Sequence, residues 1–263
     1  MNVVLVLIPL LLGILESNGN HPDPSAYCQP QLCEKGQEHV ACNYYSKLKE
    51  TIQHACHTTE MRIVYFTVLK DKVLELHNER RYRLANGNAS DLPEAARMVT
   101  MQWSPELATL AEFNAHMCML EHDECRNVAQ FPQAGQNVFV VNMKRLVPKK
   151  EMIKLYPELL ANATEAWWSE SENITSAEIK KFPCDHKKPK AFRYFATMAV
   201  ESNSHVGCAG VRYVMDNTTQ FKLTCNYARA PVCGQPIYQA MPGCQAGKNE
   251  KFSALCSPNE LFL

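Results

Sequence analysis

Residues 103–137 read WSPELATLAEFNAHMCMLEHDECRNVAQFPQAGQN and join a helix signature to a loop that carries cysteine and histidine. The hydroxyl of Ser104 can accept from the free amides of a first helical turn, Pro105 suits the first helical position, and Glu106 favours the positive end of the helix dipole. Apolar or small residues then recur at helical spacing, at Leu107, Leu110, Ala111, Ala115 and Cys118. The stretch therefore predicts a helix with one buried stripe, followed by a polar loop.

Two more helices are expected on either side of this stretch. Apolar residues between Leu69 and Leu84 recur at helical spacing, and Asn86-Gly87 would end that helix with a left-handed cap. Pro157 can start the other helix, in which Trp167 shares a face with Leu160 and Thr164.

A hairpin is expected later in the chain. Residues 206–214 and 221–227 are rich in β-forming side chains, and they flank the turn-prone pair Asp216-Asn217. Two such segments around a short turn predict a pair of antiparallel strands.

The start of the chain and its cysteines indicate the compartment. Residues 1–15 are almost wholly apolar but too short to cross a membrane, so residues 1–19 are expected to be a cleaved signal peptide. Twelve cysteines behind such a leader indicate six disulfides formed in an oxidising compartment. No second long apolar run follows, so we expect a secreted, extracellular chain without a transmembrane segment.

Charge and glycosylation signals fit the same interpretation. The chain has 27 Lys plus Arg and 27 Asp plus Glu, which gives no reason to expect nucleic acid or an anionic membrane as partner. Four sequons predict a glycoprotein, with two or three of them used, at Asn88, Asn162, Asn173 and Asn217.

The cysteine distribution divides the mature chain into three parts. Residues 20–62 hold four cysteines without a sustained hydrophobic period, so disulfides must order them. Residues 63–230 alternate helical and strand patterns and form the main domain, and residues 231–263 are a short cysteine-bearing tail.

Several motifs follow one another in a characteristic order, and they read His77-Asn78, Glu121 to Asn127, Gly135-Gln136-Asn137, Gly207-Cys208-Ala209 and Leu223 to Tyr227. In this order they resemble the CAP superfamily of cysteine-rich secretory, antigen 5 and pathogenesis-related proteins. The segment from Tyr27 to Cys56 is similar to the mature start of the insect antigen 5 (venom-allergen-like) branch. The resemblance implies an α+β fold, a three-layer α-β-α sandwich with a small antiparallel sheet.

The resemblance also implies a set of disulfides. The pairs it implies are Cys28–Cys42, Cys33–Cys125, Cys56–Cys118 and Cys208–Cys225, with Cys244–Cys256 in the tail as in many insect members. Cys184 and Cys233 then remain and are assigned to each other, although sequence alone does not fix connectivity.

Many CAP domains line a cleft with two histidines and two acidic residues, and the histidines can hold a divalent metal such as zinc. In this chain the resemblance maps the first histidine to His122 and the second acid to Glu170, but Gln136 stands at the first acidic position and Tyr194 at the second histidine. Zinc is held at about 2.0–2.3 Å by several imidazoles, thiolates or carboxylates. One histidine and one glutamate make a tight site unfavourable, so we expect no cofactor, with His122 as a weak metal candidate.

Each cleft residue also has a structural interpretation. His122 can be a hydrogen-bonded histidine beside Cys125, and Glu170 can be a partner for a backbone amide or an arginine. His77 is expected to be packing and hydrogen-bonding structure on the first helix. Trp167 could line a wall for an apolar ligand, but the buried face of an amphipathic helix explains it more simply.

Enzymatic function is not expected. The chain has neither a Gly-x-Ser-x-Gly elbow nor a His-Glu-x-x-His pair. An even cysteine count in a secreted chain argues against a free thiol nucleophile. The cleft also lacks half of the family set that would carry proteolysis.

Two binding functions remain open. The first is a secreted protein that recognises another extracellular protein through loops such as Phe131 to Gln133 and Ile174 to Lys190, in a seminal, salivary or venom secretion. The alternative is a carrier of a small apolar ligand such as a sterol, fatty acid or eicosanoid, suggested by the aromatic content around Trp167 and Phe192 to Phe195.

Overall fold

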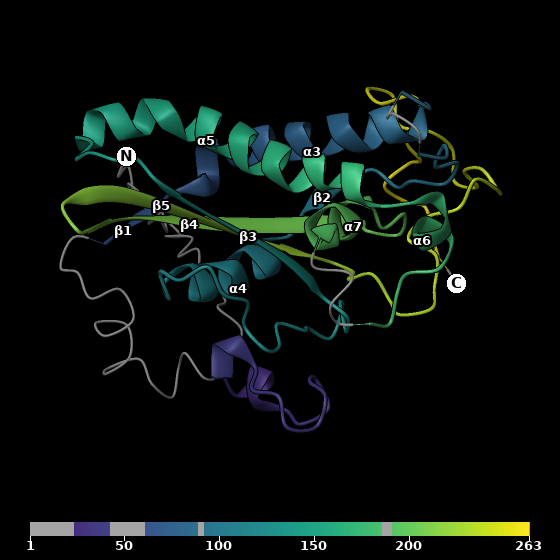
Figure 1. The fold of residues 1–263 in the computed structure, drawn as a ribbon. Coiled ribbons are helices and arrows are strands. Elements are labelled where there is room, and N and C mark those ends of the chain that lie inside the picture. The colour runs from purple at the N-terminus through teal and green to yellow at the C-terminus, as the bar shows by residue number, and fades with distance from the viewer. Residues whose placement is uncertain (1–23, 43–60, 89–91, 186–190, 263) are drawn as a thin grey trace, which may run out of the picture.

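The computed structural model describes residues 24–42, 61–88, 92–185 and 191–262 (Figure 1). The expected signal peptide therefore lies outside the described residues, as does much of the segment 20–62. The described elements are η1 (Pro24–Cys28), β1 (Arg62–Val64), η2 (Phe66–Val68), α3 (Lys70–Ala85), β2 (Gln102–Trp103), α4 (Pro105–Ala115), β3 (Gly135–Asn142), α5 (Lys149–Ser169), η3 (Glu170–Asn173), α6 (Ser176–Lys180), α7 (Arg193–Ala199), β4 (His205–Met215) and β5 (Thr218–Tyr227). No helix among them is long and apolar enough to cross a membrane.

The strands form one mainly antiparallel sheet in the order β1-β4-β5-β3, with the short β2 parallel to β4. β4 and β5 make the expected hairpin, and Cys208 lies opposite Cys225 in its register. The turn is Asp216-Asn217, with φ of 49° and 56°. This left-handed conformation is tolerated best by glycine, asparagine and aspartate, which explains the sequence at the turn.

Helices cover both faces of the sheet, which confirms the three-layer α-β-α sandwich. Figure 1 shows α3 and α5 on one side of the sheet and α4 on the other. On the first side the buried core includes Leu76, Leu160 and Trp167 against sheet residues such as Phe221. Burial of these large apolar side chains is the main source of stability for the sandwich.

The α4 helix forms as its sequence predicts. Its N-cap is Ser104, whose side chain accepts from the amide of Leu107, and Pro105 is the first helical residue. The helix packs so closely on β4 that a Cβ atom on Gly207 would lie 2.2 Å from the amide nitrogen of Ala108. Only glycine permits this approach, so Gly207 fixes how α4 sits on the sheet.

The prediction that Pro157 starts a helix was wrong. α5 begins at Lys149, and Pro157 lies inside it. A proline inside a helix removes one backbone hydrogen bond, which normally disfavours that position. The fully buried Met152 lies before the proline and Leu160 after it, on the same packed helix, so burial against the sheet outweighs the lost hydrogen bond.

Five disulfides join the described cysteines, and they are Cys28–Cys42, Cys33–Cys125, Cys184–Cys233, Cys208–Cys225 and Cys244–Cys256. The same five pairs were assigned from the sequence and the family resemblance. The sixth expected pair, Cys56–Cys118, involves a residue outside the described part of the chain. Cys33–Cys125 ties the N-terminal extension to the loop after α4, across 92 residues of sequence.

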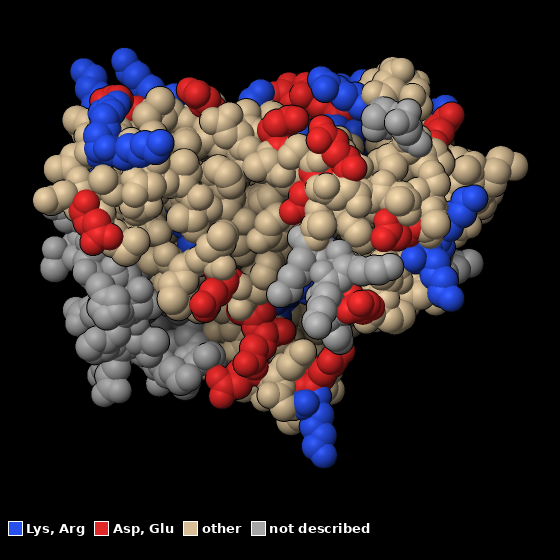
Figure 2. All heavy atoms as spheres, viewed as in Figure 1, with Lys and Arg blue, Asp and Glu red and all other residues tan. Residues whose placement is uncertain are grey.

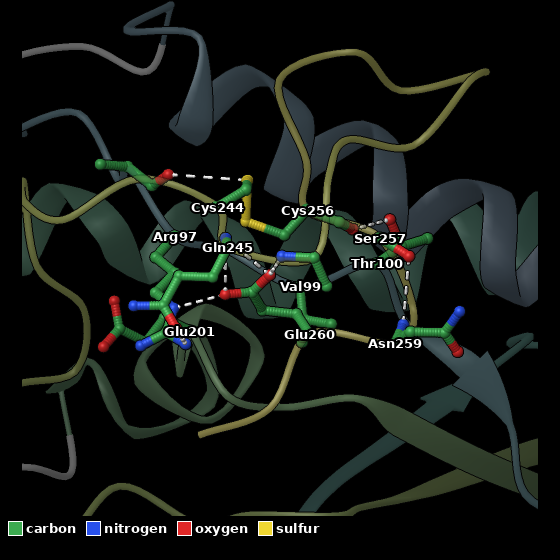
Figure 3. Close-up of a disulfide and its surroundings, with 12 residues drawn as sticks. Arg97, Val99, Thr100, Glu201, Cys244, Gln245, Cys256, Ser257, Asn259 and Glu260 are labelled. Carbon is green, nitrogen blue, oxygen red and sulfur yellow. Dashed lines mark hydrogen bonds and ion pairs between the residues drawn. A yellow bond between two sulfur atoms is a disulfide. The ribbon is translucent and has the colours of Figure 1, made fainter. Parts of the chain in front are cut away.

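The C-terminal tail is bonded to the strand-like segment before β2. Cys256 donates its amide to the carbonyl of Met98, and its own carbonyl accepts from the amide of Thr100. Figure 3 shows Glu260 beside the Cys244–Cys256 disulfide, where its carboxylate pairs with Arg97 and accepts from the amide of Gln245. The tail is therefore part of the packed structure and not a loose extension.

A buried arginine on α3 holds several segments together. Arg81 is fully buried, and its guanidinium donates to the carbonyls of Val99, Met198, Val200 and Glu201. Burial is the main cause that lowers the pKa of Arg81 to about 9, which still leaves it charged at neutral pH. This cation joins α3 to the segment before β2 and to the end of α7, and the sequence patterns did not identify it.

Candidate functional site

A cleft of about 400 Å³ opens where β3 begins and α7 begins. Its lining includes His122, Arg126 and Gln136, together with two exposed charged residues, Asp185 and Arg193, which we call the rim. The Cys184–Cys233 disulfide also lines it. The cleft therefore contains two of the four residues that the resemblance maps to the family site.

Gln136 is the centre of a hydrogen-bond network on the floor of the cleft. The side chain is 4% exposed. Its amide nitrogen donates to Asp123 at 2.6 Å and to Asn226 at 3.0 Å, and its oxygen accepts from Nδ1 of His122 at 2.9 Å. Asp123 is in turn paired with Arg126. The amide of Gln136 is thus fully used within the protein.

Tyr194 and Glu170 lie next to this network. The ring centroids of Tyr194 and His122 are 5.9 Å apart, and Tyr194 also contacts Trp167 at 6.3 Å. The carboxylate of Glu170 accepts from the backbone amides of Tyr194 at 2.7 Å and Phe195 at 3.2 Å, which caps the first turn of α7. Contacts therefore connect all four mapped residues, His122, Gln136, Glu170 and Tyr194. Glu170 has a structural role, because its carboxylate binds the backbone of α7.

Two titratable side chains of the cleft, His122 and Tyr194, have pKa values that keep them uncharged at neutral pH. Burial of the ring lowers the pKa of His122 although its edge reaches solvent, and this outweighs the hydrogen bond to Gln136, which raises it. Burial raises the pKa of Tyr194, and the nearby charge of Glu170 raises it further. At neutral pH the cleft thus presents a neutral imidazole and a neutral phenol.

The residues present do not fit the metal that the family resemblance implies. A zinc site needs several imidazole, thiolate or carboxylate ligands. Nδ1 of His122 is engaged with Gln136, and Glu170 is engaged with two amides. Within the described ranges no group of three His, Cys, Asp or Glu residues could hold a metal ion.

Behind the cleft lies a buried polar chain. Asn137 donates to the carbonyl of Tyr194 at 3.0 Å and to the hydroxyl of Tyr227 at 3.4 Å. His77 is bonded to that hydroxyl at 2.9 Å and to the carbonyl of Val73 at 2.8 Å. His77 is fully buried, so it is the packing residue that the sequence indicated and not a cleft ligand.

Sequence reasoning missed the central role of Asp123 and Asn226 in this site. Both bond Gln136, yet Asn226 comes from β5, 90 residues away in sequence. The motif Cys225-Asn226-Tyr227 was noticed only as a strand and a cysteine. The register of β3 against β5, which places Gln136 opposite Asn226, is the signal that brings them together.

The four sequon asparagines, Asn88, Asn162, Asn173 and Asn217, are all exposed. Asn162 lies within α5 and Asn217 at the tip of the β4–β5 hairpin. Exposure is compatible with a glycan at each of them, and their occupancy stays a prediction.

Comparison with known proteins agrees with the motifs. The CAP model, described as the cysteine-rich secretory protein family, matches residues 74–227. Venom allergen-1 of Aedes albopictus is 32% identical over 238 residues, which cover 89% of this chain and 88% of that protein. Antigen 5 like allergen Cul n 1 of Culicoides nubeculosus is 29% identical over 218 residues, which cover 80% and 90%.

A solved structure shares the fold. The structure of BmVAL-1 superposes with a TM-score of 0.57 at 21% identity, and the match covers 73% of this chain and 94% of that one. These matches confirm the family and the branch that the ordered motifs indicated. The chain belongs to the CAP (cysteine-rich secretory protein) family, with insect venom and antigen 5 allergens among its relatives.

Proposed function

We propose that this chain is a secreted, extracellular, non-enzymatic CAP protein that acts by recognising another protein at the rim of its cleft. The observation that carries the proposal is that the cleft floor is bonded to itself while its rim is charged and exposed. Gln136 has a partner for each polar group of its amide, whereas Arg193 is exposed on the rim and its guanidinium has no ion pair or hydrogen bond among the described residues. Ligands are recognised by groups that the protein leaves available.

Secretion is supported by the leader and the disulfides. Residues 1–19 have the composition of a signal peptide, and the described cysteines are all disulfide-bonded. Family membership points the same way, because the family is described as cysteine-rich secretory proteins.

The absence of enzymatic activity is proposed from the chemistry of the cleft. His122 donates to an amide oxygen and not to a carboxylate, so no acid orients it as a general base. Glu170 is committed to the first turn of α7. A measurable hydrolysis of peptide or ester substrates that is lost in His122→Ala would overturn this part of the proposal.

The loops expected to contact a partner are only partly available. Phe131 and Ile174 are each 6% exposed and belong to hydrophobic clusters, so they anchor the loops and do not face a partner. Gln133 and Asp185 remain exposed. The contact surface should therefore centre on the rim of the cleft and not on the whole of both loops.

No observation of the described residues favours the alternative, a carrier of a small apolar ligand. Of the aromatic side chains that suggested it, Tyr194 belongs to the cleft site and the others are core residues. Trp167 is 1% exposed and donates its indole N–H to the carbonyl of Val138, and Phe195 is fully buried. Mass spectrometry of an organic extract of the purified protein tests the carrier function. A defined lipid in stoichiometric amount would support the carrier function over protein recognition.

The recognition function is tested by capture from native seminal, salivary and venom secretions. Immobilised wild type should retain one partner protein in stoichiometric amount, and Arg193→Glu should lose it because the rim charge is reversed. Arg83→Glu is the matched control, since Arg83 is an exposed arginine at the end of α3. A partner that Arg193→Glu retains would move the contact away from the cleft, and repeatedly empty captures would contradict protein recognition.

A further inference from the structure

Cations gather at the end of the molecule opposite the cleft. Between residues 142 and 155 the chain has five Lys or Arg residues and one Glu, although its net charge is zero. The cations are Lys144, Arg145, Lys149, Lys150 and Lys154, and they are all exposed. We call this set the basic end. Figure 2 shows blue side chains projecting at the upper left, over the start of α5.

Most of these charges have no partner in the described part of the chain. Arg145 pairs with Glu151, and the two side chains are 54% and 42% exposed. No ion pair or side-chain hydrogen bond of the described residues involves the ammonium groups of Lys144, Lys149, Lys150 or Lys154. The structure therefore gives these four lysines no role in holding the fold.

The placement of the lysines works against the helix that carries them. Lys149 and Lys150 are the first two residues of α5, and Lys154 follows one turn after Lys150. The amino end of a helix is positive, so cations in its first turn are unfavourable. The carboxyl end of α5 has no basic residue and is followed by Glu170 and Glu172. Stability of the helix does not explain this distribution.

The geometry points to a polyanion as the occupant of the basic end. We propose that the basic end binds a sulfated polysaccharide of the extracellular matrix. The cationic pairs Lys144-Arg145 and Lys149-Lys150 and the single Lys154 follow one another from the loop onto the exposed face of α5. A run of exposed cations matches a flexible chain of sulfates, because such a chain is bound by charge complementarity and needs no pocket.

The preference for a polysaccharide over a lipid as the ligand rests on the proposal that the chain is secreted. The anionic leaflet of a cell membrane is the cytoplasmic one, which a secreted protein does not meet. Two apolar residues also lie at this end, Leu146 at 55% and Ile153 at 54% exposure. These side chains would enter a bilayer but have nothing to contact on a sulfated sugar. Substituting them should therefore weaken binding to a membrane and leave binding to a polysaccharide unchanged.

The test measures binding of the full mature protein to a size-defined heparin oligosaccharide. Wild type should bind with an affinity that falls steeply as salt is raised, and should not bind the desulfated oligosaccharide. Lys149→Glu/Lys150→Glu should bind roughly tenfold more weakly or worse, because two attractive contacts become repulsive. The matched control is Lys180→Glu/Lys181→Glu, which reverses two adjacent exposed lysines elsewhere and should bind like wild type.

A second variant distinguishes the lipid alternative. Leu146→Ser/Ile153→Ser should bind heparin like wild type. Its binding to vesicles of phosphatidylserine and phosphatidylcholine is measured beside it. Tight vesicle binding that this variant loses, without heparin binding by wild type, would overturn the proposal in favour of a membrane. Equal loss in the Lys180/Lys181 control would overturn it in favour of unspecific charge attraction. Neither result depends on whether the cleft rim recognises a protein.

Discussion

The cleft end and the basic end of this molecule use polar residues in opposite ways. β3 (Gly135–Asn142) and α5 (Lys149–Ser169) run between the two ends, and α5 alone spans about 30 Å. At the cleft end Gln136 is buried and both polar groups of its amide are hydrogen-bonded, whereas at the basic end Lys150 is exposed and has no ion pair or side-chain hydrogen bond among the described residues. Polar residues that bond one another stabilise a fold, and polar residues without partners are available to a ligand.

This difference changes how the family pattern should be interpreted. The four cleft positions drew attention because relatives in the family can use them, yet here they form a structural network. The basic end belongs to no family motif that the sequence showed. Family resemblance therefore locates the scaffold well and locates the function poorly, as expected when one fold carries many functions.

The largest effect we expect comes from acidification, through the polar chain behind the cleft. Burial lowers the pKa of His77 from 6.5 to about 4, and the charges of Arg80 and Arg81 act in the same direction. The unfolded chain binds this proton more tightly, so the stability is complete above about pH 6.5 and falls as the pH drops toward 4. The free energy of unfolding should decrease by about 3 kcal/mol from His77 alone.

Urea unfolding at a series of pH values measures this decrease. Burial also lowers the pKa of His39, His116, His122 and His205, so they add to the loss with the same sign. In His77→Gln the slope between about pH 6.5 and 4 should be shallower than in wild type. Heparin binding at the basic end should change little over this range, because lysines stay charged. A pH-independent stability would contradict the buried, neutral state of His77.

The second prediction compares one truncation at each end. Gln136→Ala removes a buried side chain with three polar partners and leaves Asp123 and Asn226 short of a donor. It should lower the free energy of unfolding by about 2 kcal/mol, the cost of leaving buried polar groups unpaired. Lys150→Ala at the basic end should change it by less than about 0.5 kcal/mol. Equal small effects in both variants would mean that the cleft network is not structural.

The third prediction restores the family set. Gln136→Glu/Tyr194→His places two histidines and two acids around the cleft, and the contact between residue 194 and His122 places the new imidazole near the old one. Zinc affinity measured by calorimetry should rise at least about tenfold over wild type, which is about 1.4 kcal/mol. Unchanged affinity would show that the cleft geometry, and not only the two substitutions, excludes the metal.

The fold was largely predictable because its signals are local. Ser104-Pro105, Asn86-Gly87 and Asp216-Asn217 each set a helix end or a turn through their own backbone chemistry, and each is where it was expected. The start of α5 was missed because tertiary packing tolerates Pro157, which no local rule shows.

The chemistry of the site was less predictable because its partners are distant in sequence. The bond from Gln136 to Asn226 depends on strand register, and the clamp of Arg81 depends on carbonyls up to 120 residues away. The lysines of the basic end can be read in the sequence, but a run of lysines is usually only a solvated surface and does not by itself indicate a binding site. Only the structure shows that the four lysines of the basic end have no ion pair among the described residues, and that three of them lie near the amino end of a helix, where the dipole disfavours cations.

The smallest expected effect separates function from stability at the basic end. Lys150→Glu should raise the free energy of unfolding by about 0.5 kcal/mol, because an anion in the first turn complements the helix dipole that a cation opposes. The same substitution should weaken heparin binding, so stability and binding move in opposite directions. Thermal unfolding of wild type and Lys150→Glu at low salt measures the first change, and Lys180→Glu, near the end of α6, should shift the other way. A loss of stability in Lys150→Glu would mean that the lysine serves the fold, and the contrast between the two ends would then fail.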